Sequence, residues 1–507
     1  MKRFLALALS ILMILGVLLM AGCDKGGSEN TTTKKPAGQQ TTGGNQDNDS
    51  TSSSDDQGDT IANDPYQKMN GYEDISFGGR EFVIHGADGE SDGFNSAKEI
   101  YSEEADAISV AVRERNSLIE SFYDCKIKGV ASPNPAGDAS TDITGNQHTL
   151  DLYTHHYSIT GVAGGGNAYN LLDIGSRSID FSQPWFDQQY VNSYTIKNSA
   201  GKETLYSIVG NFALTTYDCT HAIVYNKTVY QNDDDINSID IYDLVRNKKW
   251  TMDQFQFMIK NVAVDAAGGP EIDSQGGDVS GWIRTTHASH GLHAASGLSI
   301  LKTTNGVITF DVDKNTETWT NVVNKAIEIW AMPEGQTVAY SVIPKTLASG
   351  NALFASEILG SSLGNLKDLD AEIGLLPYPL FSETQENYAH YVDNHVYSYS
   401  IPVSVPDPDT VADFLAVYAF HSQIVREAYI NVYAYDYCSD PQSAEMLGII
   451  LDTMTYDPGY LSANLEGEIS NFIQSGGNKV AQFAAKRAAS ANEWIGKLVA
   501  DIDDNNV

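Results

Sequence analysis

The chain has 507 residues and a formal net charge of −35 at pH 7, because 31 lysines and arginines face 66 aspartates and glutamates. Proteins that bind nucleic acid neutralise phosphates with clustered lysine and arginine, so this balance argues against nucleic acid as a partner. A net charge far from zero favours a soluble surface.

The first 22 residues have the features of a secretory leader. Lys2 and Arg3 give a positive start, Phe4 to Met20 is almost wholly apolar, and Ala21 and Gly22 are small. These regions in this order are typical of a cleaved signal peptide. The apolar run is also at the short end of what spans a bilayer, so a retained transmembrane helix is the alternative interpretation.

The segment Met20-Ala21-Gly22-Cys23 resembles a bacterial lipobox. This resemblance implies that residues 1–22 are removed and that Cys23 receives lipid. Buried acyl chains contribute about 0.8 kcal/mol per methylene, so several chains on one cysteine hold a protein at the membrane. We therefore expect an extracytoplasmic protein, anchored to the bacterial cell membrane through Cys23.

Residues 23–64 are expected to form a flexible tether. After Cys23 this segment has no aromatic residue, and its apolar side chains are only Ala37, Ile61 and Ala62. A stretch of this composition cannot bury enough surface to offset the entropy lost on ordering.

The body of the chain, 65–507, is long enough for at least two domains, since one hydrophobic core stops growing beyond about 250–300 residues. It contains Cys125, Cys219 and Cys438. An odd number at wide spacing fits neither a disulfide framework nor a zinc site. We expect mostly buried, small apolar side chains, with room for one disulfide.

An alternation of strands and helices begins near the start of the body. Buried-strand patterns occur at 81–86, 125–130 and 171–175, and a helix with one apolar face is expected over 105–123. This β-α-β rhythm predicts an α/β architecture with a largely parallel sheet.

The same rhythm starts again further along the chain. Strands are expected at 221–226, 373–379 and 395–401, and a helix is expected to begin after Thr251 as N-cap. Asp407-Pro408 and Asp440-Pro441 each combine a capping aspartate with a proline in the first turn, which predicts two more helix starts. The end of the chain is expected to be helical to about Ile502.

Four segments of the body resemble the extracellular solute-binding family 1 proteins of ABC importers. They are Ala111–Asn116, Phe181–Asp187, Ile241–Asp253 and Gly374–Pro379, and they occur in the family's order and spacing. The resemblance implies a type II periplasmic-binding fold, in which two lobes, each a mostly parallel sheet flanked by helices, are joined by crossover strands. We place lobe one at 65–215 and 395–435, and lobe two with the C-terminal helices at 216–394 and 436–507.

The same resemblance implies a function. A monomer of this kind captures a small polar solute in the cleft between its lobes and delivers it to the membrane subunits of an ABC-type permease, without catalysis and without a cofactor. A carbohydrate is the first expectation, because the family is rich in sugar binders and the candidate residues are aromatic and acidic. A peptide or a polyamine is the alternative solute.

The candidate ligand-binding residues are aromatic or hydrogen-bonding side chains near the expected cleft, because such sites need aromatic platforms and a few polar groups. They are Trp185, Asp187, Trp282, His85, Tyr217, Asp218, Tyr391, Asp393 and Tyr397. The competing interpretation is structural, with packing for the aromatic rings and helix capping for the aspartates.

Two further patterns suggest other chemistry. Gly360-Ser361-Ser362-Leu363-Gly364 matches the G-x-S-x-G pattern of hydrolases, so a secreted serine hydrolase using Ser362 is an alternative function. His287, His290 and His293 are spaced by three but have no cysteine and few acids nearby, so we expect no metal. A lipoprotein that senses a ligand without transport is a third alternative.

Overall fold

The structure is a computed structural model. It describes residues 64–90, 93–156, 166–177, 179–266, 268–269, 271–360, 371–438, 440–461 and 465–504. The expected leader, Cys23 and the tether before residue 64 lie outside these ranges, and so does Ser362. Contacts divide the chain into Met1–Asp56 and Gln57–Val507, and every described residue belongs to the second unit.

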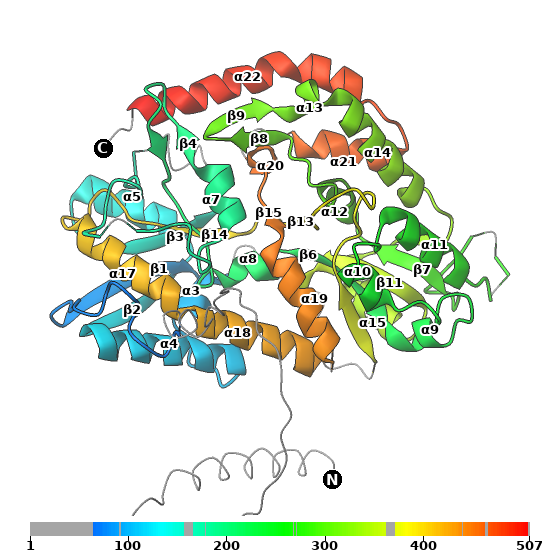
Figure 1. The fold of residues 1–507 in the computed structure, drawn as a ribbon, viewed down its shortest axis with the longest axis horizontal. Coiled ribbons are helices and arrows are strands. Elements are labelled where there is room, and N and C mark those ends of the chain that lie inside the picture. The colour runs from blue at the N-terminus through cyan, green and yellow to red at the C-terminus, as the bar shows by residue number, and fades with distance from the viewer. Residues whose placement is uncertain are drawn as a thin grey trace, which may run out of the picture. The chain divides into compact units, whose positions relative to one another are not determined.

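The first sheet has four strands in the order β14-β3-β1-β2 (Figure 1). Their bounds are β1 Arg80–Ala87, β2 Cys125–Ser132, β3 Leu152–His156 and β14 Tyr397–Ser400. β1 is parallel to β2 and β3, whereas β14 is antiparallel to β3. The predicted strands at 81–86, 125–130 and 395–401 are thus confirmed. We call this sheet, with the helices packed on it, the first half.

The strand predicted at 171–175 is wrong. This segment forms turns, in which Leu171 and Ile174 are buried and Leu172 is exposed. The Asn170 side chain accepts hydrogen bonds from the backbone N–H groups of Leu172 and Leu205, and thereby holds the segment against its neighbour. The third parallel strand of this sheet is instead β3. Its sequence Leu-Tyr-Thr-His-His is too polar to predict a buried strand, although its first four residues are buried.

The second sheet has five strands in the order β10-β7-β11-β6-β12. Figure 1 labels β7, β11 and β6 of this sheet. Their bounds are β6 His221–Asn226, β7 Ser280–Arg284, β10 Gly335–Thr337, β11 Ala352–Ile358 and β12 Ile373–Leu376. β7 is parallel to β10 and β11, but β6 is antiparallel to both β11 and β12. The α/β class is confirmed, and this second sheet is mixed where a mostly parallel one was expected. We call it, with its helices, the second half.

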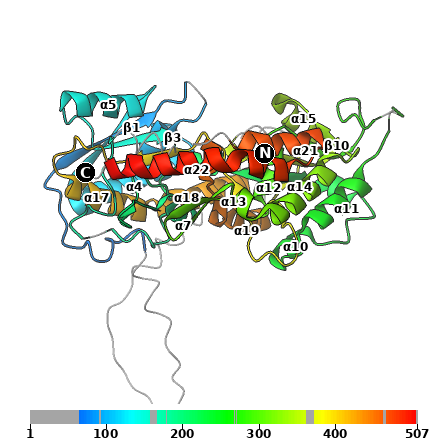
Figure 2. The ribbon, with the colours of Figure 1, turned by 90° about the horizontal axis from the view of Figure 1, so that it is seen from above.

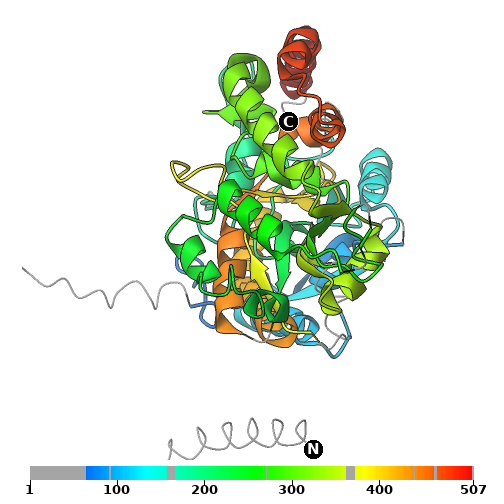
Figure 3. The same ribbon diagram turned by 90° about the vertical axis from the view of Figure 1, so that its right-hand side faces the viewer.

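Helices cover both sheets. In the first half these are α3 Ser96–Ile100, α4 Ala107–Tyr123, α5 Pro135–Gly145, α17 Pro408–His421 and α18 Gln423–Asn431. In the second half, which faces the viewer in Figure 3, they are α9 Lys227–Gln231, α10 Ile241–Arg246, α11 Met252–Val262, α15 Ile343–Ala348 and α19 Pro441–Asp452. The predicted caps are confirmed, since Thr251, Asp407 and Asp440 each accept a hydrogen bond from a backbone N–H of the first turn.

Shorter elements complete the described unit. The small strands are β4 Ile196–Lys197, β5 Glu203–Thr204, β8 Leu301–Thr304, β9 Val307–Phe310, β13 His390–Tyr391 and β15 Met454–Thr455. The remaining helices are α7 Gln188–Tyr194, α8 Leu214–Asp218, α12 Ala288–Ala294, α13 Asp311–Lys314, α14 Thr316–Trp330, α20 Pro458–Leu461, α21 Glu466–Ser475 and α22 Val480–Asp504, with the 3-10 turn η1 Tyr340–Val342 and the π-helix η2 Val432–Tyr437.

The long helix α22 confirms the helical C-terminal end predicted to about Ile502. It packs on α13, α14 and β9, and it runs lengthwise in Figure 2. Near its end, Asp503 accepts a hydrogen bond from the backbone N–H of Ser199, in the turn between β4 and β5, at 2.9 Å. The last helix thereby reaches elements that lie far apart in the sequence.

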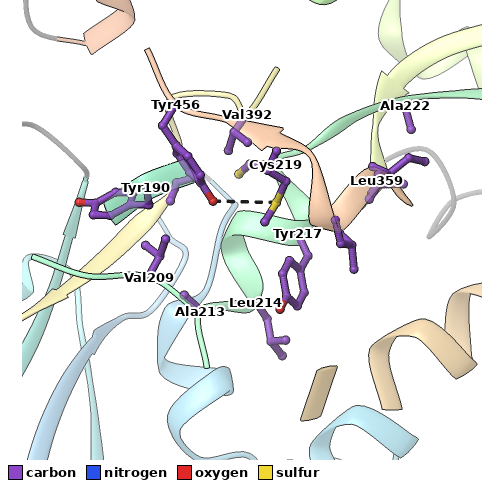
Figure 4. Close-up of a cluster of buried hydrophobic side chains, with 14 of the residues drawn as sticks. Tyr190, Val209, Ala213, Leu214, Tyr217, Cys219, Ala222, Leu359, Val392 and Tyr456 are labelled. Atoms are coloured by element: carbon purple, nitrogen blue, oxygen red, sulfur yellow. Dashed lines mark hydrogen bonds between the residues drawn. The ribbon is translucent and has the colours of Figure 1, made fainter. Parts of the chain in front are cut away.

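The two halves are joined where two chain segments pair. The chain leaves the first half after α8 and returns between β13 and β14. At this junction Asp393 N–H donates to the Cys219 carbonyl at 2.9 Å, and Leu359 N–H donates to the Thr220 carbonyl at 2.9 Å. Figure 4 shows the buried cluster around them, to which Val392, Tyr217 and Tyr456 contribute. Buried backbone groups of this kind need a hydrogen-bond partner within the protein, and this pairing supplies it.

The cysteines behave as expected of small buried residues. Cys125, Cys219 and Cys438 are all buried and form no disulfide in the described part of the chain. Over the same residues, none of the helices has the length and apolar character needed to cross a membrane.

Asp440 offers a test of the fold. Its carboxylate accepts from the N–H and the hydroxyl of Ser443 and pairs with Lys227, the first residue of α9, which follows β6 directly. Asp440→Ala should lower the unfolding free energy by about 1–2 kcal/mol, the usual cost of a lost N-cap. Urea unfolding measures this, with the exposed Asp234→Ala as control; equal midpoints for the two variants would contradict the capping role.

Candidate functional site

A pocket of about 440 Å³ lies between the first half, the junction and the helix that follows α18. Its walls come mainly from the first half, α8 and that helix, and Gly360 after β11 is the lining residue that the second half contributes. The lining residues are Gly93, Phe94, Asn95, Lys98, Glu99, Glu104, Asp106, Ile108, Ser109, Leu214, Thr215, Asp218, Gly360, Tyr429, Tyr433 and Tyr437. We call it the tyrosine pocket. Its volume falls within the range of about 300–1,000 Å³ that is usual for small-molecule sites.

Three tyrosines at four-residue spacing form one wall. The rings of Tyr429 and Tyr433 are stacked with centroids 4.3 Å apart, and Tyr437 meets Tyr433 edge-on at 4.9 Å. The spacing places them on one face of α18 and its continuation η2. η2 is a π-helix, a rare form that is frequently found at functional sites. Tyr429 and Tyr433 are 1% and 5% exposed, so their stack is the buried base of this wall, and Tyr437 presents the more exposed ring.

Asp218 is the predicted site residue that lies in this pocket. Its Oδ1 accepts hydrogen bonds from the hydroxyls of Tyr429 at 2.9 Å and Tyr433 at 3.1 Å. Burial raises the pKa of Asp218 above its ordinary value. No lysine or arginine among the described residues forms an ion pair with it. The pocket therefore sets a half-buried carboxyl group beside tyrosine hydroxyls, an arrangement suited to a ligand with hydroxyl groups.

Glu99 holds α8, and with it Asp218, in position. Its carboxyl accepts from the backbone N–H of Thr215 at 3.0 Å and from the Tyr399 hydroxyl at 2.8 Å, so it links α3, α8 and β14. The side chain of Arg115 donates to the carbonyl oxygen of Glu99 itself at 3.0 Å. Glu99 is 2% exposed, and burial raises its pKa to about 8.

A group of histidines lies next to the tyrosine pocket, and we call it the histidine cluster: His156, His221, His287, His290 and His395. Phe94 of the tyrosine pocket stacks on His395 at 5.3 Å, so the two regions adjoin. At the centre of the cluster, Asp393 lies 2.6 Å from Nδ1 of His395 and 3.9 Å from Nε2 of His221. Burial alone would raise the pKa of Asp393, but its two histidine neighbours outweigh burial and hold this pKa well below its ordinary value.

The cluster lies where strands of both sheets end. β3 ends at His156 and β6 begins at His221, and His287 follows β7. Open α/β sheets bind ligands at the carboxyl ends of their parallel strands. Burial lowers the pKa of His287 and lowers that of His290 to about 3. Within the described ranges, no three His, Cys, Asp or Glu side chains are arranged to hold a metal ion.

Four predicted site residues therefore lie in or beside these two regions. Besides Asp218 and Asp393, they are Tyr391, whose ring packs between His221 and His290 at 4.9 and 5.3 Å, and Tyr397, which stacks on His156 at 4.5 Å.

Two more predicted residues line a different pocket. Asp187 and Tyr217 border a cavity of about 330 Å³ together with Arg426 and Met454. Asp187 caps α7 through the Tyr190 N–H at 2.9 Å and accepts from the Tyr456 hydroxyl at 3.0 Å. Burial raises the pKa of Asp187 to about 6. These contacts give Asp187 a structural role in this structure.

The remaining three are engaged in packing. Trp185 is 3% exposed and meets Phe420 edge-on at 5.0 Å. Trp282 has no exposed surface, and its Nε1 donates to the Ser356 hydroxyl at 2.8 Å. His85 lies inside β1 and contacts Asp138 of α5 through Nδ1 at 2.8 Å. None of the three is among the lining residues of the tyrosine pocket, which is the reason for leaving them out of the site.

Sequence reasoning missed the tyrosines of α18 and η2. The signal was present as tyrosines at positions 429, 433 and 437, which repeat every four residues. An aromatic stripe at helical spacing is usually core, and only the pocket beside it shows another use.

Comparisons with known proteins give structural neighbours only. No family model matches the chain, and no curated protein matches it. A family 1 extracellular solute-binding protein from Bifidobacterium longum subsp. infantis is 14% identical, with a TM-score of 0.47, covering 82% of this chain and 100% of its own.

Two further solved structures resemble the chain. The GacH receptor of Streptomyces glaucescens, solved unliganded and with acarbose, is 12% identical with a TM-score of 0.46, covering 82% of this chain and 99% of its own. The maltose/maltodextrin-binding domain MalE of Bdellovibrio bacteriovorus, bound to maltotriose, is 15% identical with a TM-score of 0.45 and the same coverage.

Glu99 predicts a pH dependence of stability. Its pKa is about 8 in the folded chain against 4.5 as the ordinary value, so the folded state holds the extra proton between these pH values. The stability from Glu99 is present in full below pH 4.5 and is lost as the pH rises to about 8, at up to about 1.4 kcal/mol per pH unit.

Glu99→Gln should remove this contribution, because glutamine does not titrate. Unfolding free energies of both proteins at several pH values between 4.5 and 8.5 measure it, and the advantage of the original chain at pH 5 should shrink toward pH 8. A difference between the two proteins that stays constant with pH would show that Glu99 is already ionised in the fold.

Proposed function

We propose that this chain is an extracytoplasmic solute-binding protein that captures a carbohydrate in the tyrosine pocket and the adjoining histidine cluster. The observation that carries this proposal is the stacked pair Tyr429 and Tyr433 with both hydroxyls on the carboxyl of Asp218, in a pocket that Gly360 of the second half also lines. The role is binding and not catalysis.

The chemistry of the pocket matches a sugar. The apolar face of a sugar ring packs on an aromatic ring, and its hydroxyls need acceptors and donors. Tyr437 and Phe94 supply part-exposed ring faces, and Asp218 supplies an acceptor. A nucleic acid or other polyanion would meet carboxyl groups from Glu99, Glu104, Asp106 and Asp218, with Lys98 as the basic side chain in the lining.

Capture is proposed to work by closure of the two halves. The halves are joined through the paired segments at Cys219–Thr220 and Val392–Asp393, which can act as a hinge. A solute that touches both halves binds the closed arrangement more tightly than the open one, and so shifts the population toward it. The closed form would then be delivered to the membrane subunits of an ABC-type permease.

The location of the protein belongs to the same proposal. The leader 1–22 and the lipobox-like segment ending at Cys23 support export and a lipid anchor, and the composition of 24–64 supports a tether. A monomer held in this way would present its pocket outside the cell membrane.

The proposal predicts saturable sugar binding. Isothermal titration of the full chain with glucose, galactose, maltose, maltotriose and cellobiose should give a defined dissociation constant for at least one of them. A saccharide at 100 times its dissociation constant should raise the unfolding free energy by about 2.7 kcal/mol.

Tyr437→Ala should weaken that binding by about tenfold or more, because the variant loses an aromatic platform. Tyr435→Ala is the matched control, since Tyr435 is on the same π-helix but is 52% exposed and outside the pocket. Spermidine and trialanine test the alternative solutes. Binding of one of these, with every saccharide inert, would refute the carbohydrate proposal.

A further inference from the structure

Three side chains at one edge of the second sheet have polar atoms that lack a hydrogen-bond partner within the described residues. The unpaired atoms are Nδ1 and Nε2 of His221, Oε2 of Glu357 and Oγ1 of Thr285. His221 is 1% exposed and Glu357 is 5% exposed. Buried polar atoms are almost always hydrogen-bonded in folded proteins, so a group of unpaired ones calls for an explanation.

The three residues lie at the same end of the second sheet. The register puts Thr285 beside Glu357 on one face, and His221, which is opposite Ile358, projects from the other face close to Glu357. His221 is the first residue of β6 and pairs with Ile358, next to Glu357 on β11, while Thr285 directly follows β7, the other neighbour of β11. Burial raises the pKa of Glu357, and the nearby His221 and Thr285 act against this rise. The carboxyl ends of β7 and β11 and the start of the antiparallel β6 thus form a single polar edge, where sheets of this class hold ligands.

This edge is close to the tyrosine pocket. Gly360 lines the tyrosine pocket and follows Glu357 by three residues, a separation of at most about 10 Å along the chain. Gly360 packs tightly against Asp218, since a Cβ built on it would lie 2.7 Å from the Asp218 Cβ. The end of β11 therefore connects Asp218 on one side with the unpaired carboxyl oxygen of Glu357 on the other.

We infer that His221, Thr285 and Glu357 form a second subsite that binds hydroxyl groups of the captured solute, and that the solute is a saccharide of at least two rings. One ring packs on the tyrosines, and the next reaches this polar edge. The inference rests on the proposed function and adds two points: the minimum length of the solute and the residues that bind its second ring.

The chemistry of the subsite selects hydroxyl groups. A hydroxyl both donates and accepts, and the three side chains offer a carboxyl, a hydroxyl and an imidazole that together supply both roles. An anionic group is disfavoured, because Asp393 lies 3.9 Å from His221 and Glu357 is itself acidic. A metal ion is disfavoured as well, because the described residues contain no suitable set of three ligands.

The test compares two saccharides on variants of the full chain. For the original chain, maltotriose or cellobiose, whichever binds in titration, should bind at least about tenfold more tightly than glucose, since the second subsite adds hydrogen bonds. We take the ratio of the dissociation constant for glucose to that for the longer saccharide. Glu357→Gln and Thr285→Val should each lower this ratio toward one. Thr285→Ser should restore it, because serine keeps the hydroxyl.

A matched control separates ligand contact from general loss of structure. Asp413 is also a buried acid with an unpaired oxygen, but it belongs to α17 of the first half. Asp413→Asn should leave the ratio unchanged. Melting temperatures of all variants, taken without sugar, identify any that fail to fold, and the serine variant keeps the test valid in that case.

The two proposals fail in different ways. If saccharides bind the original chain and Tyr437→Ala weakens them, but the ratio is the same in Glu357→Gln and Thr285→Val, the second subsite is refuted and the proposed function stands. If no saccharide binds the original chain, both are refuted. A crystal structure of the complex with only water at His221, Glu357 and Thr285 would also overturn the subsite.

Discussion

Everything at the site depends on two backbone hydrogen bonds at the junction of the halves. Asp393 N–H donates to the Cys219 carbonyl, and Leu359 N–H donates to the Thr220 carbonyl. They fasten the end of β11 and both crossing segments to one another inside a buried apolar cluster (Figure 4). Because backbone groups in such a core have no water to bond, the pairing is obligatory. It brings the ends of strands from two separate sheets to the same place, which no single sheet could do.

The polar groups near this junction fall into two classes with different consequences. Glu99 has all the partners that a buried carboxyl needs, and it serves to hold α8 in place. Glu357 and His221 are equally buried but keep unpaired atoms. A satisfied buried network stabilises and orders a fold, whereas unpaired groups cost free energy until something binds them. By this contrast Glu99 has a structural role, whereas Glu357 and His221 are the residues that we propose to contact a ligand.

Local chemistry made much of the fold predictable. The aspartate–proline pairs at 407–408 and 440–441 predict helix starts from their own side chains, and apolar runs predict strands. The strand prediction at 171–175 failed because Leu171 and Ile174 anchor a turn against the core, and only tertiary contacts distinguish such a turn from a strand. The residues of the candidate site were harder to predict than the fold. Asp218, predicted from its place beside the expected crossover, lines the tyrosine pocket, whereas Trp185 and Trp282 are buried, and the burial of an aromatic ring cannot be predicted from its place in the sequence.

The central claim is that a saccharide binds between the halves and draws them together. Spin labels placed at Val110 and Val264, which are 46% and 51% exposed and lie in the first and second halves, report this distance directly. The label would be attached to cysteines at these positions with Cys23 replaced by serine, since Cys125, Cys219 and Cys438 are buried. Pulsed electron–electron double resonance should show a shorter distance between the labels when the saccharide is present at saturating concentration. An unchanged distance with saturating saccharide would contradict the account.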